Sequence, residues 1–486
     1  MELKMVKRPS PLDIYKILDK SNCKECGSNT CMEFVTDLLE RRKKLEDCPT
    51  AHLPDKKRQK IFDLIKPPQM PVEFGPVDRR CIFGGEEVYY RHDLTFFNQT
   101  ALAVDIFDEM TDLIDTVKYL SDFKISRIGE DLTLDALALR CTSNDPEKFE
   151  KSVKEVSEAT NLPLILCSWN SEALIKAAEA IKSKKPLLYA ATKQNWKEIG
   201  ECAVKNNLPV VCYSSSLDEL VSIASTLENM GVKEIALDPG AAIGEGYNTQ
   251  TLDKIMKIRF SSIRDGSLFT KYPVIGIAAS VWATEKSKDE DDIAAVQYKE
   301  ALAAIMMMSS DANLIVIHTG RKKDEVWLPL ALMTYRQNIF TDPRIYPSVD
   351  PGLFAIGEPK KNSPIFMTSN YRMTKIPVEQ DIKDAHIDSW LLVVDTDGLG
   401  IEAGVAGGQL SADKVAEEMK KQKVFDKVDH RILVIPGMAA RLSGAIEDEA
   451  NCYVVVGPGD SSGIQKFMDD RWNPDEFMKE YQERIS

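Results

Sequence analysis

Eight short apolar runs recur through the middle of the chain, and amphipathic segments with helical periodicity separate them. The runs are nearly continuous in hydrophobicity, as the strands of a parallel sheet are when both of their faces are buried. Eight strand–helix units over about 245 residues predict a TIM (β/α)8 barrel, and an open doubly wound sheet is the alternative. The runs span residues 101–107, 137–141, 162–169, 186–192, 208–214, 234–239, 272–280 and 314–319.

Four shorter apolar runs follow in the last third of the chain, again separated by helical segments such as 411–421. This pattern predicts a small open α/β domain. The stretch 357–364 holds two prolines, a glycine and two lysines, and it is interpreted as a linker and a hinge. The four runs span residues 364–368, 390–395, 431–435 and 452–456.

Four of the ten cysteines lie close together near the N-terminus and read C-x2-C-x4-C-x16-C, as Cys23, Cys26, Cys31 and Cys48. Three thiolates on one tight loop and a fourth that returns after a helix can surround a single cluster, and 4Fe–4S clusters are held by four thiolates. Zinc, which usually takes two C-x2-C pairs, and two disulfides are the alternatives. The other six cysteines are interpreted as buried core residues.

Together these patterns predict an α/β chain of four segments. Ser10 and Thr30 are the expected N-caps of the two helices beside the clustered cysteines. The segments are a small helical 4Fe–4S module at 1–60, a linker at 61–98, the barrel at 99–357 and the C-terminal α/β domain at 358–486.

The overall charge narrows the classes of partner. The chain has 62 Lys and Arg against 76 Asp and Glu, a formal net charge of −14. Nonspecific binding to nucleic acid or to an anionic membrane needs clustered positive charge, so no nucleic acid and no membrane partner is expected. No apolar run is long enough to span a bilayer, and the first residues lack an apolar signal core, which predicts a cytoplasmic protein.

The carboxyl ends of the four C-terminal runs are rich in glycine and small polar residues. Ligands of open α/β sheets bind across such ends, and glycine lets a backbone approach a ligand closely. No G-x-G-x-x-G or G-x-x-x-x-G-K motif is present, so a nucleotide site is disfavoured and a large flat ligand is expected, with ordinary turns as the alternative. The candidate contacts are Thr368, Ser369, Asn370, Asp395, Thr396, Gly398, Leu399, Pro436, Gly437, Gly457 and Pro458.

Four polar residues fall at the carboxyl ends of the predicted barrel strands, where the active sites of this fold lie. They are Asn170, Asn195, Asp238 and His318. They form no recognisable catalytic set and are interpreted as strand-end caps or turn residues.

Several strings of the sequence resemble one known family. They are SPLDIYKILDKSNCKECGSNTCMEF, LLVVDTDGLG, HRILVIPG and CYVVVGPGDSSGI. Over nearly its whole length the chain resembles the large (gamma) subunits of the corrinoid/iron–sulfur protein of acetyl-CoA decarbonylase/synthase, the carbon monoxide dehydrogenase/acetyl-CoA synthase system. The resemblance implies that the four clustered cysteines hold a 4Fe–4S cluster and that the C-terminal strand-end loops hold a corrinoid.

The resemblance also implies a function within a methyltransferase complex. Members of the family carry the N5-methyl of a methyl-tetrahydropterin on corrinoid cobalt to the nickel A-cluster of acetyl-CoA synthase, or back. The 4Fe–4S cluster reduces cobalt after accidental oxidation, and no protein residue is catalytic. The implied partners are the small (delta) subunit in a heterodimer, the acetyl-CoA synthase subunit, and a pterin methyltransferase or methyl-tetrahydropterin itself.

Many cobalamin proteins place a histidine under cobalt with the motif D-x-H-x-x-G. His386 lies in a near match that ends in Ser389 and precedes its strand, and His430 lies at the entrance of another strand. The cobamide is therefore expected to be base-off, with no protein histidine ligand.

Two other functions remain open from the sequence. One is a stand-alone iron–sulfur electron-transfer protein. The other is a TIM-barrel methyltransferase that acts directly on a pterin, which would need barrel-mouth residues such as Asn170 and Asp238.

Overall fold

The computed structural model describes most of the chain. Contacts between residues group it into two compact units, Met1–Ile125 with Leu132–Phe340, and Ser126–Asp131 with Thr341–Ser486. Among the described helices, none is long and apolar enough to cross a membrane. The described residues are 9–40, 42–89, 98–127, 130–240, 247–267, 270–283, 293–309, 311–318, 326–339 and 347–485.

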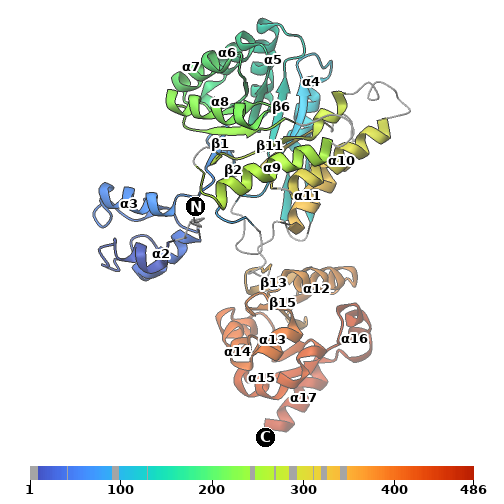
Figure 1. Cartoon of the computed structure of the whole chain (residues 1–486). Coiled ribbons are helices and arrows are strands. Elements are labelled where there is room, and N and C mark those ends of the chain that lie inside the picture. The colour runs from blue at the N-terminus through green and yellow to red at the C-terminus, as the bar shows by residue number, and fades with distance from the viewer. Residues whose placement is uncertain are drawn as a thin grey trace. The chain divides into compact units, whose positions relative to one another are not determined.

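An eight-stranded parallel sheet forms the body of the first unit (Figure 1). Its strand order is β10-β9-β8-β7-β6-β3-β12-β11. The backbone N–H of Leu237 in β10 donates to the carbonyl of Pro273, 2.8 Å away and just ahead of β11. This contact closes the sheet, so the predicted TIM barrel is confirmed and the open sheet is excluded. The strands are β3 (Ala101–Phe107), β6 (Ala136–Arg140), β7 (Leu164–Cys167), β8 (Leu187–Ala191), β9 (Val210–Tyr213), β10 (Ile235–Asp238), β11 (Ile275–Ile277) and β12 (Leu314–Ile317).

Helices follow the barrel strands and cover the outward faces of the sheet. The outward side chains, such as Leu102 and Leu139, pack with helical residues such as Leu174 in one apolar cluster. This two-sided burial explains why the strands are nearly continuous in hydrophobicity. The helices are α4 (Leu113–Asp122), α5 (Pro146–Ala159), α6 (Ser171–Ala180), α7 (Trp196–Asn206), α8 (Leu217–Met230), α9 (Tyr247–Ile263), α10 (Ile293–Ser309) and α11 (Trp327–Ile339).

A short antiparallel hairpin, β1 (Pro71–Phe74) with β2 (Cys81–Gly84), packs against the N-terminal end of the barrel. Phe74 and Phe83 contact edge to face, with ring centroids 6.0 Å apart, and share an apolar cluster with barrel-interior alanines. The prediction that 61–98 is only a linker is therefore wrong. The strands β1 and β2 are each four residues long, which is too short for a clear alternation of apolar and polar residues to show in the sequence.

The described part of the N-terminal module contains the α-helices α1 (Pro11–Tyr15), α2 (Cys31–Leu39) and α3 (Asp55–Ile65). Ser10 and Thr30 cap α1 and α2 as predicted, because their side chains accept hydrogen bonds from backbone N–H groups in the first turns. Ile61 of α3 is fully buried in the core of the module, so the module continues beyond the predicted boundary at residue 60.

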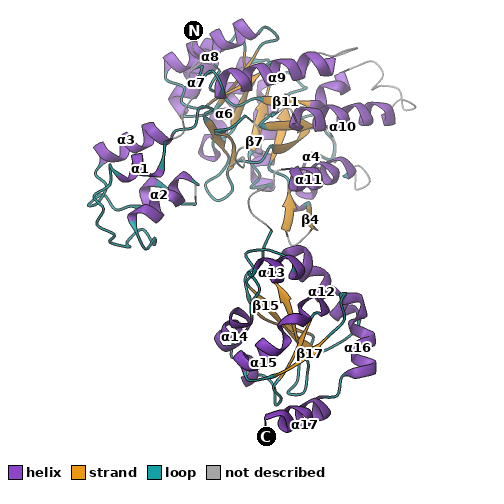
Figure 2. Ribbon diagram, turned by 60° about the horizontal axis from the view of Figure 1, so that its bottom comes forward, coloured by secondary structure: helices purple, strands orange, loops and turns teal. Residues whose placement is uncertain are grey.

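The second unit is a five-stranded sheet with helices on both faces (Figure 2). The order is β13-β15-β14-β16-β17, in which only β13 is antiparallel. Two separate apolar clusters lie on the two faces of the sheet. The strands are β13 (Gly352–Ile356), β14 (Ile365–Ser369), β15 (Ser389–Val394), β16 (Ile432–Ile435) and β17 (Tyr453–Val456), and the helices are α12 (Arg372–Asp384), α13 (Ile401–Gly407), α14 (Ala412–Lys421), α15 (Ser443–Ala450), α16 (Ile464–Arg471) and α17 (Pro474–Ile485).

The stretch 357–364 lies inside this second unit, between β13 and β14. Its backbone is fixed by local bonds: the N–H of Glu358 donates to Asp388 at 2.9 Å, and the N–H of Lys360 donates to Ser363 Oγ at 2.9 Å. The hinge interpretation of this stretch is therefore wrong, and the units divide near residue 340 instead of 357. Proline, glycine and lysine occur in a loop between two strands of one sheet as readily as in a linker between domains.

Candidate functional site

The four predicted cluster ligands line one small cavity in the N-terminal module. Cys23 and Cys26 lie on the loop before α2, Cys31 begins α2, and Cys48 follows a single helical turn. All ten cysteines of the chain are free thiols, which speaks against the two disulfides. Burial, followed by the charges of the other three clustered thiols, raises the pKa of Cys48 to about 11. The structure therefore brings the four thiols together, as the spacing predicts.

Hydrogen bonds from side chains and backbone groups fix the conformation of the loop that carries Cys23 and Cys26. Asn22 accepts the backbone N–H of Cys31 at 2.8 Å and directs its own N–H toward Cys31 Sγ at 3.4 Å. Lys43 Nζ donates to the carbonyl of Cys26 at 2.6 Å. A four-thiol set with an N–H directed at sulfur fits an iron–sulfur cluster, whose potential depends on such bonds.

His52 also lines this cavity, although no pattern in the sequence predicts it. Its Nδ1 lies 2.7 Å from Asp19 and its Nε2 lies 3.4 Å from Glu25. Cys23, Glu25 and His52 could also converge on a metal ion. Both ring nitrogens of His52 face carboxylates, so neither is directed at the four thiols. The four thiols are therefore the better set of ligands for a cluster.

Asn370 joins two loops at the carboxyl edge of the second sheet. Its Oδ1 accepts hydrogen bonds from the N–H of Thr396 (3.0 Å), the hydroxyl of Thr396 (2.8 Å) and the N–H of Gly398 (3.1 Å). Its Nδ2 donates to Asp395 at 3.0 Å. The side chain thereby ties the loop after β15 to the end of β14.

The loops after β16 and β17 meet at the same edge through glycine. The N–H of Gly437 donates to the carbonyl of Pro458 at 2.9 Å. A Cβ atom on Gly437 would lie 3.0 Å from the backbone N of Gly459, which is tighter than most real Cβ contacts. The absence of a side chain therefore lets the two backbones pack side by side.

Two hydroxyls at the end of β14 are buried and lack partners. Thr368 and Ser369 are 1% and 0% exposed, and neither hydroxyl oxygen has a hydrogen-bond partner within the described part of the chain. A buried hydroxyl without a partner costs about 1–3 kcal/mol. Unpaired hydroxyls beside glycine-lined loops fit the binding of a large ligand that supplies polar groups.

The eleven predicted ligand contacts lie at or just after the carboxyl ends of β14, β15, β16 and β17. These strands are consecutive in the sheet in the order β15-β14-β16-β17, so their loops lie along one edge. The structure thus brings the predicted residues together, and their contact with a corrinoid stays a prediction.

Neither histidine of the second unit lies at this edge. His386 follows α12 and precedes β15, and His430 precedes β16, so both lie at the opposite ends of the strands. His430 is 5% exposed, its Nε2 lies 2.9 Å from the carbonyl of Ser363, and its Nδ1 lies 3.2 Å from the N–H of Ile432. Nδ1 is therefore the acceptor, Nε2 carries the proton, and His430 is a structural residue.

The burial of His430 predicts a pH-dependent stability. Desolvation lowers its pKa in the folded chain below the unfolded value of about 6.5. Below about pH 6.5, His430 binds more protons in the unfolded chain than in the folded chain. The free energy of unfolding therefore has its full value above about pH 6.5 and decreases as the pH falls. We expect the free energy of unfolding of the second unit, measured by chemical denaturation, to depend less on pH between 7 and 5 in His430→Gln. An unchanged pH dependence would contradict this.

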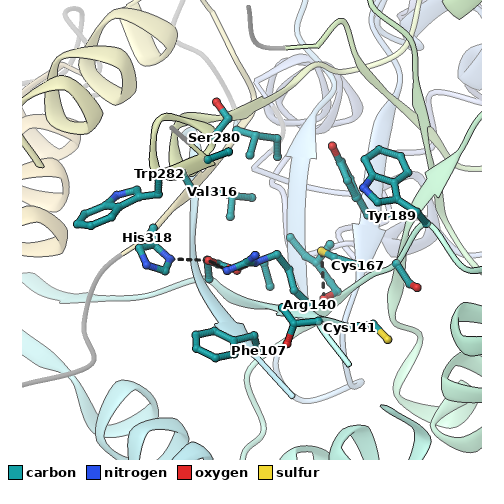
Figure 3. A pocket seen from close by; sticks show the side chains of 18 of the residues that line it. Phe107, Arg140, Cys141, Cys167, Tyr189, Ser280, Trp282, Val316 and His318 are labelled. Carbon is teal, nitrogen blue, oxygen red and sulfur yellow. Dashed lines mark hydrogen bonds and ion pairs between the residues drawn. The ribbon is translucent and has the colours of Figure 1, made fainter. Parts of the chain in front are cut away.

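A large cavity lies at the carboxyl ends of the barrel strands, with a volume of about 880 Å³. Figure 3 shows His318, Trp282 and Val316 on one side and Tyr189 on the other, with Arg140 between them. Arg140 binds Asp105 through Nε (2.6 Å) and Nη2 (2.8 Å), and His318 Nδ1 lies 2.6 Å from the same carboxylate. Asp105 is thus shared between a guanidinium and an imidazole.

Two further carboxyl groups at this end are buried. Asp238 accepts the hydroxyl of Tyr189 at 2.6 Å and the N–H of Gly240 at 2.8 Å, and burial raises its pKa to about 6. Glu300 accepts the indole N–H of Trp282 at 2.8 Å, and burial raises its pKa to about 8. Of these two carboxyl groups only Asp238 lines the cavity, and a raised carboxyl pKa in a cavity is typical of binding or catalytic sites.

The four polar residues predicted at the barrel mouth divide into two pairs. Asn170 caps α6 by accepting the N–H groups of Glu172 and Ala173, and Asn195 accepts the N–H of Thr192 in a turn, as predicted. Asp238 and His318 instead line the cavity, so their interpretation as caps or turn residues alone is wrong. Their principal partners come from distant strands, which a local pattern does not reveal.

Two family models match this chain, and one solved structure is reported beside them. Residues 71–468 match the family model described as "CO dehydrogenase/acetyl-CoA synthase delta subunit", and residues 18–50 match the model described as "Putative Fe-S cluster". Among solved structures, dihydropteroate synthase from Thermus thermophilus aligns with a TM-score of 0.38 and 13% identity, over 55% of this chain and 99% of that chain. The two family models define the chain as a subunit of the carbon monoxide dehydrogenase/acetyl-CoA synthase class with an iron–sulfur module.

Curated relatives specify the subunit. Acetyl-CoA decarbonylase/synthase complex subunit gamma of Methanothermobacter thermautotrophicus is 38% identical over 94% of this chain and 98% of its own. Subunit gamma 1 of Methanosarcina mazei is 40% identical over 96% and 99%, and subunit gamma of Archaeoglobus fulgidus is 38% identical over 97% and 100%. The chain belongs to the family of gamma subunits of the acetyl-CoA decarbonylase/synthase complex, which confirms the resemblance seen in the sequence.

Proposed function

We propose that the chain is the corrinoid/iron–sulfur methyl carrier of its complex. It accepts the N5-methyl group of a methyl-tetrahydropterin and delivers this group to the nickel A-cluster of acetyl-CoA synthase. The transfer is reversible. The observation that carries the proposal is the carboxyl edge of the second sheet. There, the buried hydroxyls of Thr368 and Ser369 at the end of β14 have no hydrogen-bond partner within the described residues. The loops after β16 and β17 approach each other closely at Gly437 and Gly459. Family membership supports the same assignment.

The residues of the chain would hold two groups. The four clustered thiols hold the 4Fe–4S cluster, and the loops tied by Asn370 and Gly437 hold the corrinoid against the strand ends. When bound, the corrinoid supplies a reduced cobalt that takes up the methyl group, and the cluster supplies electrons that restore the reduced state. His386 and His430 lie at the opposite strand ends, so neither histidine of the second unit is offered to the cofactor at this edge.

The proposal includes the partners of such a carrier. They are the delta subunit in a heterodimer, the acetyl-CoA synthase subunit, and a pterin methyltransferase or methyl-tetrahydropterin as the donor. Membership in a multi-subunit complex supports protein partners in general. A cytoplasmic location is the compartment that we infer for this exchange.

An anaerobic visible spectrum combined with metal counts tests the proposal. We expect about one cobalt and four irons per chain, with corrinoid bands beside the iron–sulfur shoulder. Iron without cobalt, in protein purified from a corrinoid-producing source, would instead favour the electron-transfer function.

Two glycine-to-alanine variants test the proposed corrinoid site at the carboxyl edge of the second sheet, called the corrinoid edge below. In Gly437→Ala the new Cβ would crowd the backbone of Gly459, so we expect a cost of about 1–3 kcal/mol and a several-fold loss of bound cobalt. The control is Gly444→Ala in α15, where a Cβ meets nothing within 4 Å. Helix propensity predicts that this control gains up to about 1 kcal/mol and keeps its cobalt. Equal cobalt contents in the two variants would contradict the assignment of this edge.

A further inference from the structure

A cationic side chain reaches the backbone of one predicted cluster ligand in the N-terminal module. Lys43 follows α2, and its Nζ donates to the carbonyl of Cys26 at 2.6 Å. A Cβ atom on Gly27 would lie 3.1 Å from the same Nζ, and Gly27 has a φ of +79°, which favours glycine. The loop therefore leaves room for an ammonium group beside the peptide group of Cys26.

The charge of Lys43 is not compensated by a carboxylate. Within the described part of the chain its ammonium group forms no ion pair, whereas the neighbouring Arg42 binds Asp37 through Nε at 2.9 Å. A cation that is bonded only to a neutral carbonyl keeps its charge available to other groups nearby. A cluster held by four thiolates is anionic, so it would supply the counter-charge.

A second cation of the module has a structural explanation. Arg58 lies on α3 and donates to three carbonyls of the segment that carries Cys48, including that of Cys48 itself at 2.8 Å. Its guanidinium thereby fixes the path of the chain to the fourth thiol. The ammonium group of Lys43 makes a single hydrogen bond within the described residues, so its loss should disturb the fold little. Lys43 is therefore the side chain whose charge can be tested by itself.

Two carboxylates of the module are turned toward His52. Asp19 lies 2.7 Å from its Nδ1, and Glu25 lies 3.4 Å from its Nε2. Among the residues that the structure describes, neither carboxylate pairs with Lys43. Replacement of Lys43 by a neutral residue therefore changes the charge around the four thiols by one full unit.

We propose that Lys43 raises the reduction potential of the 4Fe–4S cluster. Reduction transfers one electron from an external one-electron donor, and it adds one negative charge to a cluster that is already anionic. A fixed cation nearby stabilises the reduced form more than the oxidised form, and the potentials of such clusters depend on the charges and hydrogen bonds around them. This inference rests on the proposed iron–sulfur function, because it needs a cluster at the four thiols.

The test is a redox titration of the full-length protein, purified anaerobically, with dithionite as the reductant and the EPR signal of the reduced cluster as the readout. Lys43→Met removes the charge and keeps an unbranched side chain. We expect the equilibrium constant for reduction to fall by about threefold or more, which lowers the midpoint potential by about 28 mV at about 59 mV per tenfold for a one-electron couple. Iron is counted in every variant, and about four irons per chain should remain.

Two controls make the shift specific. Lys43→Arg keeps the charge and should keep the potential of the unaltered protein. Lys57→Met removes an exposed lysine of α3, and because solvent screens such a charge, the equilibrium constant should change by less than about twofold. An unchanged potential in Lys43→Met, an equal shift in Lys57→Met or a loss of iron in Lys43→Met would overturn this inference alone. An unaltered protein without iron would overturn the proposed cluster as well.

Discussion

Replacing Cys26 with alanine is expected to empty the N-terminal module of iron and to abolish reductive reactivation of the carrier. Cys26 is one of four thiols around a single cavity, and a 4Fe–4S cluster needs a thiolate for each iron. Iron should fall from about four per chain to nearly none. Methyl transfer should survive once the cofactor has been reduced chemically, because the proposed corrinoid site belongs to the other unit.

The measurements are iron and cobalt contents, and methyl-transfer rates with and without a chemical reductant. Cys202→Ala is the matched control, since Cys202 is also a free thiol but is buried in α7, away from the cluster cavity. We expect it to keep its iron and its reactivation. If chemically reduced Cys26→Ala remained inactive, the module would have a role beyond reduction.

Replacing Asn370 with alanine is expected to cause the largest loss at the corrinoid edge. The side chain accepts three hydrogen bonds from Thr396 and Gly398 and donates one to Asp395. Its removal leaves several buried polar groups unpaired, so we expect a loss of roughly 3 kcal/mol in the unfolding free energy of the second unit. Because the same bonds shape the loop after β15, most of the bound cobalt should be lost as well.

Two further variants make this result specific. Asn370→Asp keeps an acceptor for Thr396 and Gly398 but replaces the donor to Asp395 with a second carboxylate, so we expect an intermediate effect. Gln465→Ala removes an exposed amide whose side chain bonds to Asp469 on the same helix, and it should change neither quantity. Denaturation curves and cobalt counts check all three. Full cobalt retention in Asn370→Ala would contradict the role of this loop.

The sequence predicted the barrel and most of the C-terminal sheet because buried parallel strands leave a local signal. Each predicted barrel run overlaps a strand, since apolar side chains are needed on both faces. The elements that it missed lack that signal. β13 is an edge strand with partly exposed residues, and the hairpin of β1 and β2 is too short to show an alternation.

By itself, the sequence determined that four thiols surround one site and that glycine-rich loops end the C-terminal strands, because spacing along the chain governs both. Only the tertiary structure decided what lies at the barrel mouth. Asp105 and His318 are separated by 213 residues, and Tyr189 and Asp238 by 49, yet each pair shares a hydrogen bond. Closure of the barrel brings the ends of distant strands together, and contacts made in that way leave no pattern in the local sequence.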